Sequence, residues 1–197
     1  MKKIVVLILA LFIVSCAAPI NRKSSINYAI TAQAALQKND WNTARKYWAK
    51  AVVNAELGNS NPKRLAALSY EYGRALGVNC FFSESETYLK KSYDLDSTNS
   101  GPAHMSLLEL ARLNYDQKKY KEATSYFEKL IPIYDKFNAE AKDPTGVALV
   151  FKEYSNALSS IDKKTKATTF SQRASELEKI GNKSNTERTP YGTQCVG

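Results

Sequence analysis

Few side chains in this sequence could carry out covalent or metal chemistry. The chain has one histidine, His104, and three cysteines, whereas a metal site needs several His, Cys or carboxylate ligands that converge. It contains no phosphate-binding P-loop, no dinucleotide-binding glycine motif and no Gly-x-Ser-x-Gly nucleophile elbow. We therefore predict a protein that is not an enzyme and has no metal and no cofactor. His104 is expected to cap a helix or to lie at the surface.

Two of the cysteines leave two interpretations open. In an oxidising compartment, two thiols such as those of Cys80 and Cys195 often pair. Cys80 could equally be a small buried apolar residue at the start of a packed helix, with Cys195 near the end of the chain. The sequence does not decide between these interpretations.

The composition suits one folded domain or one short array of repeats. Of the 197 residues, 44% are hydrophobic, so most of the chain can bury a core. The net charge of +9 could favour nucleic acid, an anionic membrane surface or an acidic partner. The basic residues are scattered, however, and they match no known nucleic-acid signature. We therefore expect no nucleic-acid partner.

The first sixteen residues predict export and a lipid anchor. Two lysines precede an apolar run of eleven residues, Ile4 to Val14, whereas a membrane-spanning helix needs about 20. Residues 1–15 are therefore predicted to be a cleaved signal peptide. The segment Ile13-Val14-Ser15-Cys16 resembles a bacterial lipobox. That resemblance implies acylation of Cys16 with palmitate-like chains and cleavage just before it.

The residues after this cysteine complete the prediction. Residues 16–23 would form the lipidated N-terminus and a short flexible tether. The residue after the cysteine is Ala17 rather than aspartate, which by the same resemblance favours the outer membrane, facing the periplasm. An ordinary signal peptide with a chance cysteine is the alternative.

From residue 24 onward, the chain has the apolar periodicity of helices. Apolar residues recur at i, i+3, i+4 and i+7, and no strand-like alternation persists, so we predict an all-α domain over residues 24–180. New helices are expected near Pro62, Pro102 and Pro144, because proline suits the first turn of a helix. Smaller breaks at 38–40, 77–79, 117–119 and 160–162 divide the stretches into helical hairpins. Residues 181–197 are polar and aperiodic, which predicts a disordered tail.

One segment recurs along the chain. Residues 41–51 alternate small Ala44 and Ala51 with large Trp41, Tyr47 and Trp48. The pattern returns at 120–130, more loosely at 82–92 and most loosely at 164–174. The aligned small residues, Ala44, Ser85, Ala123 and Ala167, are separated by 41, 38 and 44 residues. Such a period indicates stacked units, in which small residues let helices approach and aromatic residues fill the gaps beside them.

These segments resemble the second helix of a tetratricopeptide repeat (TPR). In the preceding helices, Tyr72-Gly73-x-x-Leu76 matches the first-helix pattern, and Tyr154-Ser155-x-x-Leu158 matches it more weakly. The separations exceed the family period of about 34 residues, and the proline that usually closes the second helix is absent. The resemblance implies a divergent helical-hairpin (TPR-like) solenoid of about four units. A helical bundle of another type is the alternative.

The resemblance also implies a groove for a partner, lined by the first helices of the repeats. Arginine forks pair with carboxylates, and tyrosine adds apolar area with a polar tip. We therefore expect an extended peptide or an acidic helix as the ligand, with two arginines of adjacent repeats acting together. The alternative is that these residues face solvent on the convex side. The candidate groove residues are Tyr70, Arg74, Arg112, Tyr115, Asp116, Lys152 and Asn156.

Together, these features predict a lipid-anchored periplasmic scaffold or adaptor. Its partners would be proteins of the cell envelope, in outer-membrane, pilus or cell-wall machinery. The alternative is an obligate structural subunit of one envelope complex. A cell-wall enzyme is a third possibility, against which the missing catalytic residues argue.

Overall fold

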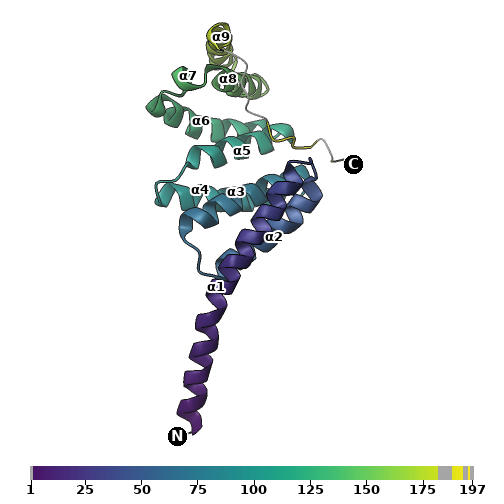
Figure 1. Cartoon of the computed structure of the whole chain (residues 1–197). Helices are drawn as coiled ribbons and strands as arrows, with labels where there is room; N and C mark the ends of the chain where they lie inside the picture. The colour runs from purple at the N-terminus through teal and green to yellow at the C-terminus, as the bar shows by residue number, and fades with distance from the viewer. Residues whose placement is uncertain (1, 182–187, 193–194, 196–197) are drawn as a thin grey trace. The chain divides into compact units, whose positions relative to one another are not determined.

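The computed structural model describes the backbone of residues 2–181, 188–192 and 195, and the side chains from Ala17 onward within those ranges. The chain divides into two compact units, unit 1 (Met1–Gly101) and unit 2 (Pro102–Gly197). Throughout the described ranges, the regular structure is helical, which confirms the all-α prediction (Figure 1). Each unit contains two antiparallel helical hairpins.

Unit 1 consists of the hairpins α1–α2 and α3–α4. Its helices are α1 (Lys2–Leu36), α2 (Trp41–Leu57), α3 (Pro62–Val78) and α4 (Phe82–Thr98). Side-chain caps fix two of the helix starts: Asp40 accepts a hydrogen bond from the backbone N–H of Thr43, and Asn61 accepts one from Arg64. Such caps satisfy backbone donors that the first turn leaves unpaired. The expected break at 38–40 lies between α1 and α2, and a new helix begins at Pro62 as expected.

The core of unit 1 explains the alternation of small and large residues in α2. Ala44 and Ala51 are fully buried and Trp48 is 5% exposed, and they pack with Ala32 of α1 and Ala75 of α3. Trp41 and Tyr47 lie at the edge of the same cluster and are partly buried. The small residues allow close helix approach while the indole of Trp48 fills the remaining space, as the sequence predicts.

Within each hairpin, two small residues twelve positions apart are buried. These are Ala32 and Ala44, Gly73 and Ser85, Ala111 and Ala123, and Ser155 and Ala167. In two of the pairs, a serine hydroxyl donates to the partner's carbonyl oxygen: Ser85 to Gly73 at 2.7 Å and Ser155 to Ala167 at 2.8 Å. A Cβ atom at Gly73 would lie 2.8 Å from Cγ of Leu89, so this contact needs glycine.

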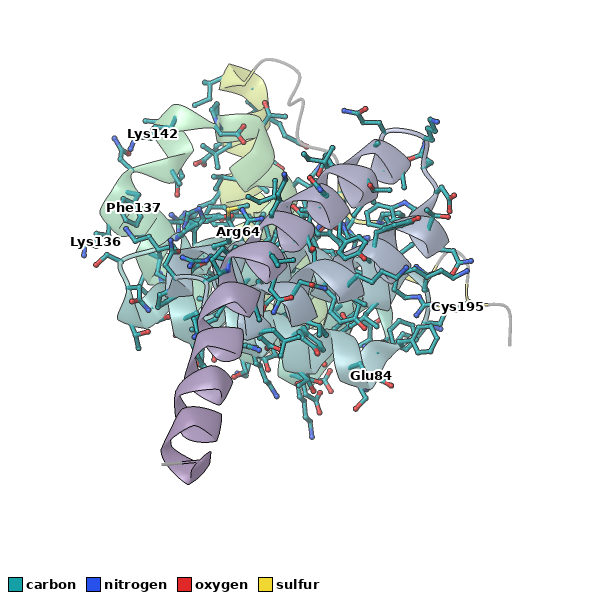
Figure 2. All side chains as sticks on the ribbon, turned by 60° about the horizontal axis from the view of Figure 1, so that its bottom comes forward. Arg64, Glu84, Lys136, Phe137, Lys142 and Cys195 are labelled. Carbon is teal, nitrogen blue, oxygen red and sulfur yellow. The ribbon has the colours of Figure 1, made fainter. Side chains whose placement is uncertain are left out.

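Unit 2 consists of the hairpins α5–α6 and α8–α9 with a short helix between them. The helices are α5 (Ala103–Asp116), α6 (Tyr120–Phe137), α7 (Ala139–Lys142), α8 (Pro144–Ser159) and α9 (Lys164–Ile180). The short helix α7 was not predicted from the sequence. It follows Asn138, whose left-handed backbone ends α6. The side chains of Lys136 and Phe137 at the end of α6, and of Lys142 at the end of α7, are exposed (Figure 2).

The turns share one backbone feature. A non-glycine residue with positive φ occurs at every connection except that between α7 and α8, including Asn39, Lys118 and Asp162 inside hairpins. Cys80 is one of these residues, with φ of 69°, and it lies in the turn before α4 rather than in a packed helix. It is neither fully buried nor fully exposed. Cys80 is also disulfide-bonded, as is Cys195. The interpretation of Cys80 as a small buried apolar residue at the start of a packed helix is therefore wrong.

The N-terminal helix differs from the expected layout. α1 continues through residues 16–23, so the segment predicted as a flexible tether is helical, with Pro19 inside it. The side chain of Cys16 lies outside the described residues, so its acylation stays a prediction. Among the residues that the structure describes, no helix has the length and apolar character needed to cross a bilayer.

The end of the chain also departs from its prediction. Residues 182–187, 193–194 and 196–197 lie outside the described part, so disorder is not tested there. Between them, Thr189 is 1% exposed and Tyr191 is 4% exposed. The predicted disorder is therefore wrong for residues 188–191, because polar contacts to unit 2 hold them, as described next.

Candidate functional site

An acidic position recurs in the first helix of three hairpins. Glu71, Glu109 and Glu153 each precede the small residue of the helix by two positions, at Gly73, Ala111 and Ser155. In unit 2, Glu109 on α5 is 5% exposed and Glu153 on α8 is 6% exposed. Buried carboxylates require charged or hydrogen-bonding partners, so the neighbours of these two residues define what the surface can do.

Arg112 is the first of these partners. Its Nε donates to Oε2 of Glu153 at 2.9 Å, and its side chain is only 3% exposed. The pair joins α5 to α8, the first helices of the two hairpins of unit 2. Arg112 is therefore buried and already paired, and its predicted role in binding an acidic ligand stays a prediction. A neighbouring acid in the same unit already neutralises it.

The second partner is Arg188, which comes from the end of the chain. Its Nε donates to Oε1 of Glu153 at 2.7 Å, and its Nη2 donates to Oδ1 of Asp116 at 2.6 Å. Burial by itself would lower the pKa of Arg188, but the hydrogen bond to Asp116 and the charge of Glu153 raise it overall. The guanidinium therefore bridges two carboxylates on two helices, which its planar fork suits.

Tyr191 completes the contact. Its hydroxyl donates to Oε2 of Glu109 at 2.6 Å, in a buried position. Thr189 and Pro190 lie between the two anchors, and no helix includes them. Figure 1 shows this segment, at the yellow end of the colour scale, beside α5. We call Glu109, Arg112, Asp116 and Glu153 the α5–α8 surface, and residues 188–191 the terminal segment.

The phenol of Tyr134 on α6 is sensitive to the same charges. Burial raises its pKa to about 12, and the positive charge of Arg112 opposes that rise, whereas the carboxylates of Glu153, Asp143 and Glu109 add to it. His104 lies beside it, with ring centroids 6.4 Å apart. The histidine therefore packs against an aromatic ring at the start of α5.

The other predicted residues of unit 2 divide between two places. The amide of Asn156 approaches the hydroxyl of Tyr115 at 3.4 Å, which links α8 to α5 near Asp116. Lys152 instead pairs with Glu178 of α9 in an exposed ion pair, so the structure places it toward the hairpin partner and not at the α5–α8 surface. The resemblance to TPR proteins implied that Lys152 lines the groove with the other candidates, whereas its ion pair lies on the side of α9.

Tyr70 and Arg74 belong to unit 1. Arg74 donates to Glu71 at 3.0 Å, one turn away on α3. Its guanidinium also lies 5.5 Å from the ring centroid of Tyr70 and 5.7 Å from that of Trp41. Such distances suit cation–π attraction. Because Arg74 and Arg112 lie in different units, their joint action on one ligand stays a prediction.

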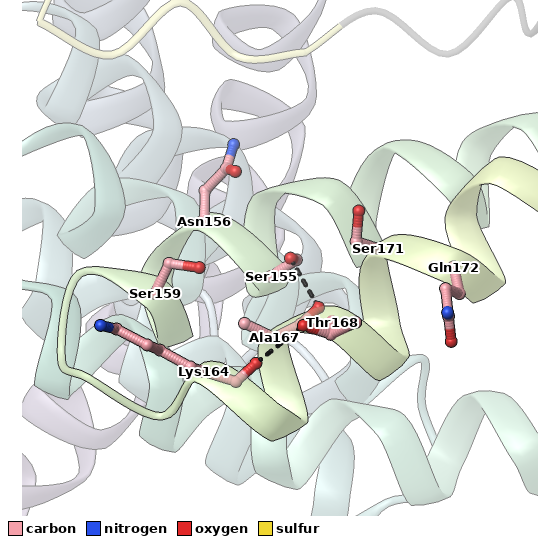
Figure 3. A pocket seen from close by; sticks show the side chains of 8 residues that line it. All are labelled: Ser155, Asn156, Ser159, Lys164, Ala167, Thr168, Ser171 and Gln172. Carbon is pink, nitrogen blue, oxygen red and sulfur yellow. Dashed lines mark hydrogen bonds between the residues drawn. The ribbon is translucent and has the colours of Figure 1, made fainter.

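A pocket also opens between α8 and α9, with a volume of about 550 Å³ (Figure 3). Two of its hydroxyls are already bonded to carbonyl oxygens, Ser155 to Ala167 and Thr168 to Lys164. The described residues hold no cluster of His, Cys, Asp and Glu able to bind a metal ion. The lining is Ser155, Asn156, Ser159, Lys164, Ala167, Thr168, Ser171 and Gln172.

Four functional candidates were not predicted from the sequence: Glu109, Glu153, Arg188 and Tyr191. The two glutamates had a signal, because Glu-Tyr-Gly-Arg at 71–74, Glu-Leu-Ala-Arg at 109–112 and Glu-Tyr-Ser-Asn at 153–156 align directly. The terminal segment had only a weak one. Arg188 and Tyr191 flank a Thr-Pro pair, which favours an extended backbone before the proline.

Comparisons with known proteins support the fold. No protein-family model matches the sequence, and no curated protein matches it. Among solved structures, BtubC (BKLC) from P. vanneervenii is similar at a TM-score of 0.74 and 15% identity, over 83% of this chain and 67% of that one. A putative kinesin light chain from Podosopora anserina with nearly identical TPR-like repeats has a TM-score of 0.64 and 16% identity, over 81% and 77%. The chain therefore has an all-α, TPR-like repeat fold.

Proposed function

We propose that this protein is a lipid-anchored adaptor of the cell envelope that binds other proteins through its repeats. A TPR-like fold of this kind indicates a protein-interaction scaffold. The envelope location and the anchor rest on the sequence near Cys16, and the binding role rests on unit 2. The two parts of the proposal are therefore tested separately.

The observation that carries the binding role is the extended terminal segment on the first helices of unit 2. Two buried carboxylates and Asp116 receive a guanidinium and a phenol from a stretch of chain outside any helix. This is how an extended peptide is recognised, with charge-assisted bonds at fixed anchor points. The chemistry differs from the sequence expectation, because the surface is acidic and suits a basic segment.

The anchor is tested by a Cys16→Ala variant of the full chain, expressed in a bacterium with lipoprotein processing. We expect the wild type in the membrane fraction after a high-salt wash and the variant in the soluble fraction, since several acyl chains give stable attachment. Cys80→Ala is the matched control and should stay with the membrane. Retention of Cys16→Ala in washed membranes would mean that another feature holds the protein there.

The binding role is tested by affinity capture from crosslinked cells. Asp116→Lys reverses a charge at the edge of the α5–α8 surface, and Lys152→Glu changes an exposed charge that the structure places elsewhere. We expect the first variant to lose most of the captured protein and the second to keep it. Equal capture by the two variants would place the binding surface outside unit 2's first helices.

One observation favours the alternative of an obligate structural subunit. Ile26 and Ile30, one turn apart on α1, are 45% and 64% exposed, and Val53 and Leu57 on α2 are 49% and 62% exposed. Exposed apolar residues at such spacing mark contact surfaces. Purified protein without its anchor decides the matter: an adaptor stays monodisperse alone, whereas a subunit aggregates until its partner is added.

A further inference from the structure

We propose that the terminal segment is an internal substitute ligand: the α5–α8 surface recognises partner segments with arginine followed three residues later by tyrosine, and residues 188–191 occupy it until such a partner displaces them. The inference rests on the proposed binding role and names its partner chemistry. It does not depend on the lipid anchor.

The donors of the segment explain the choice of arginine. Nε of Arg188 meets Glu153 and Nη2 meets Asp116, so one planar group satisfies carboxylates on two helices. A lysine has one ammonium on a flexible stem and cannot present two donors in that fixed arrangement. Arg112 already donates to Oε2 of Glu153, and the guanidinium of Arg188 donates to Oε1, the other oxygen of the same carboxylate.

The second anchor selects a phenol. Tyr191 buries its ring, at 4% exposure, and delivers its hydroxyl to Oε2 of Glu109. Phenylalanine could fill the same space but would leave that buried carboxylate oxygen without its donor, which is costly. Between the anchors, Pro190 lacks a backbone N–H and restricts Thr189 to extended conformations, which sets the distance between the two side chains.

One acceptor remains unused by this occupant. Oδ2 of Asp116 is buried and has no hydrogen-bond partner among the described residues, although Oδ1 of the same carboxylate receives Arg188. Arg188 itself keeps 29% of its side chain exposed. A partner segment that donates one more hydrogen bond to Asp116 would therefore fit better than the chain's own segment. An imperfect occupant of this kind can be displaced.

The test titrates a labelled, capped peptide of sequence Glu-Arg-Thr-Pro-Tyr-Gly against the full chain with its cysteines reduced. The receiving proteins are the wild type and the double variant Arg188→Ala, Tyr191→Ala, which cannot occupy its own surface. We expect the variant to bind the peptide at least tenfold more tightly, because a tethered competitor acts at an effective concentration of about millimolar. Peptides with lysine for arginine, or phenylalanine for tyrosine, should bind at least fivefold more weakly.

Three outcomes would overturn the inference. The first is a folded double variant that does not bind the peptide. The second is equal binding by the wild type and the variant. The third is a wild type that self-associates through this segment while the variant does not, which would make a second copy of the chain the occupant.

A second measurement applies even if the double variant fails to fold. Excess peptide added to the wild type should increase hydrogen exchange in residues 188–192 and leave α5 and α8 protected. Unchanged exchange would show that the segment is a permanent part of unit 2. Because these experiments use purified protein, their failure would leave the anchored adaptor to be judged by cell fractionation and capture alone.

Discussion

Arg74 and Arg112 occupy the same position in their hairpins, one residue after a buried small residue, yet their surroundings differ. Arg74 in unit 1 is 20% exposed and pairs with a glutamate one turn away on its own helix. Arg112 in unit 2 is 3% exposed and pairs with a glutamate 41 residues away on the next hairpin. Repeat position therefore does not fix an arginine's role. The role of Arg112 is fixed by Glu153, the acid that the neighbouring hairpin supplies.

The largest expected difference between the two units is the loss of stability when each arginine is removed. Arg112→Ala leaves Glu153 with one fewer cation in a buried site, and we expect a loss of about 3–5 kcal/mol in the free energy of unfolding. Arg74→Ala breaks a partly exposed local pair and should cost about 1 kcal/mol or less. Urea unfolding followed by circular dichroism measures both. Equal losses would show that the two arginines have equivalent environments after all.

Alkaline pH should affect unit 2 through Tyr134. Its pKa of about 12 in the folded chain lies above the usual value of 10.0, so the folded state holds the phenol proton more tightly. The resulting stability is complete below pH 10 and is lost as the pH rises from 10 through about 12. A shift of this size corresponds to about 2–3 kcal/mol.

The matched comparison uses Tyr72 of unit 1, whose pKa is also raised, first by burial and then by the charge of Tyr88. Urea unfolding at several alkaline pH values, combined with ultraviolet absorbance of the ionised phenols, measures the effect. Tyr134→Phe should flatten the pH dependence of stability more than Tyr72→Phe does. A steeper effect of Tyr72→Phe would contradict the burial of Tyr134 among the carboxylates.

The smallest expected difference concerns the serines that close the hairpins. Ser85 in unit 1 and Ser155 in unit 2 each donate to a carbonyl oxygen across a hairpin. Replacement by alanine removes the donor and retains the small size, so each variant should lose about 1 kcal/mol in the free energy of unfolding. The two losses should agree, because the contacts are equivalent. A loss of stability in only one of the two variants would show that the serine hydrogen bond does not stabilise both units.

Much of the fold could be predicted from the sequence because its signals are local. The periodicity of apolar residues, the prolines at helix starts and the small–large alternation around Trp48 all act within one or two turns. They correctly placed the hairpins and most of the turns. The short helix α7 was missed because four residues carry too little periodicity to be recognised.

Little of the candidate site could be predicted, because it is made by long-range pairing. Nothing near Arg112 in the sequence shows that Glu153 will neutralise it, and the ion pair of Lys152 with α9 depends on how two helices turn toward each other. The aligned glutamates were visible, but their burial was not. Arg188 and Tyr191 lie in a polar stretch whose composition suggests disorder, and only the acids of α5 and α8 give it a fixed position.

The separations along the chain also set an order of events during folding. The closing contacts of the hairpins join residues 12 apart, and such local contacts form quickly. The bonds of Arg188 to Asp116 and of Tyr191 to Glu109 span 72 and 82 residues. A chain synthesised from its N-terminus completes α5 to α9 before residues 188–191 emerge. Each new molecule therefore passes through a period in which α5 and α8 are folded and their carboxylates have not yet met the end of the chain.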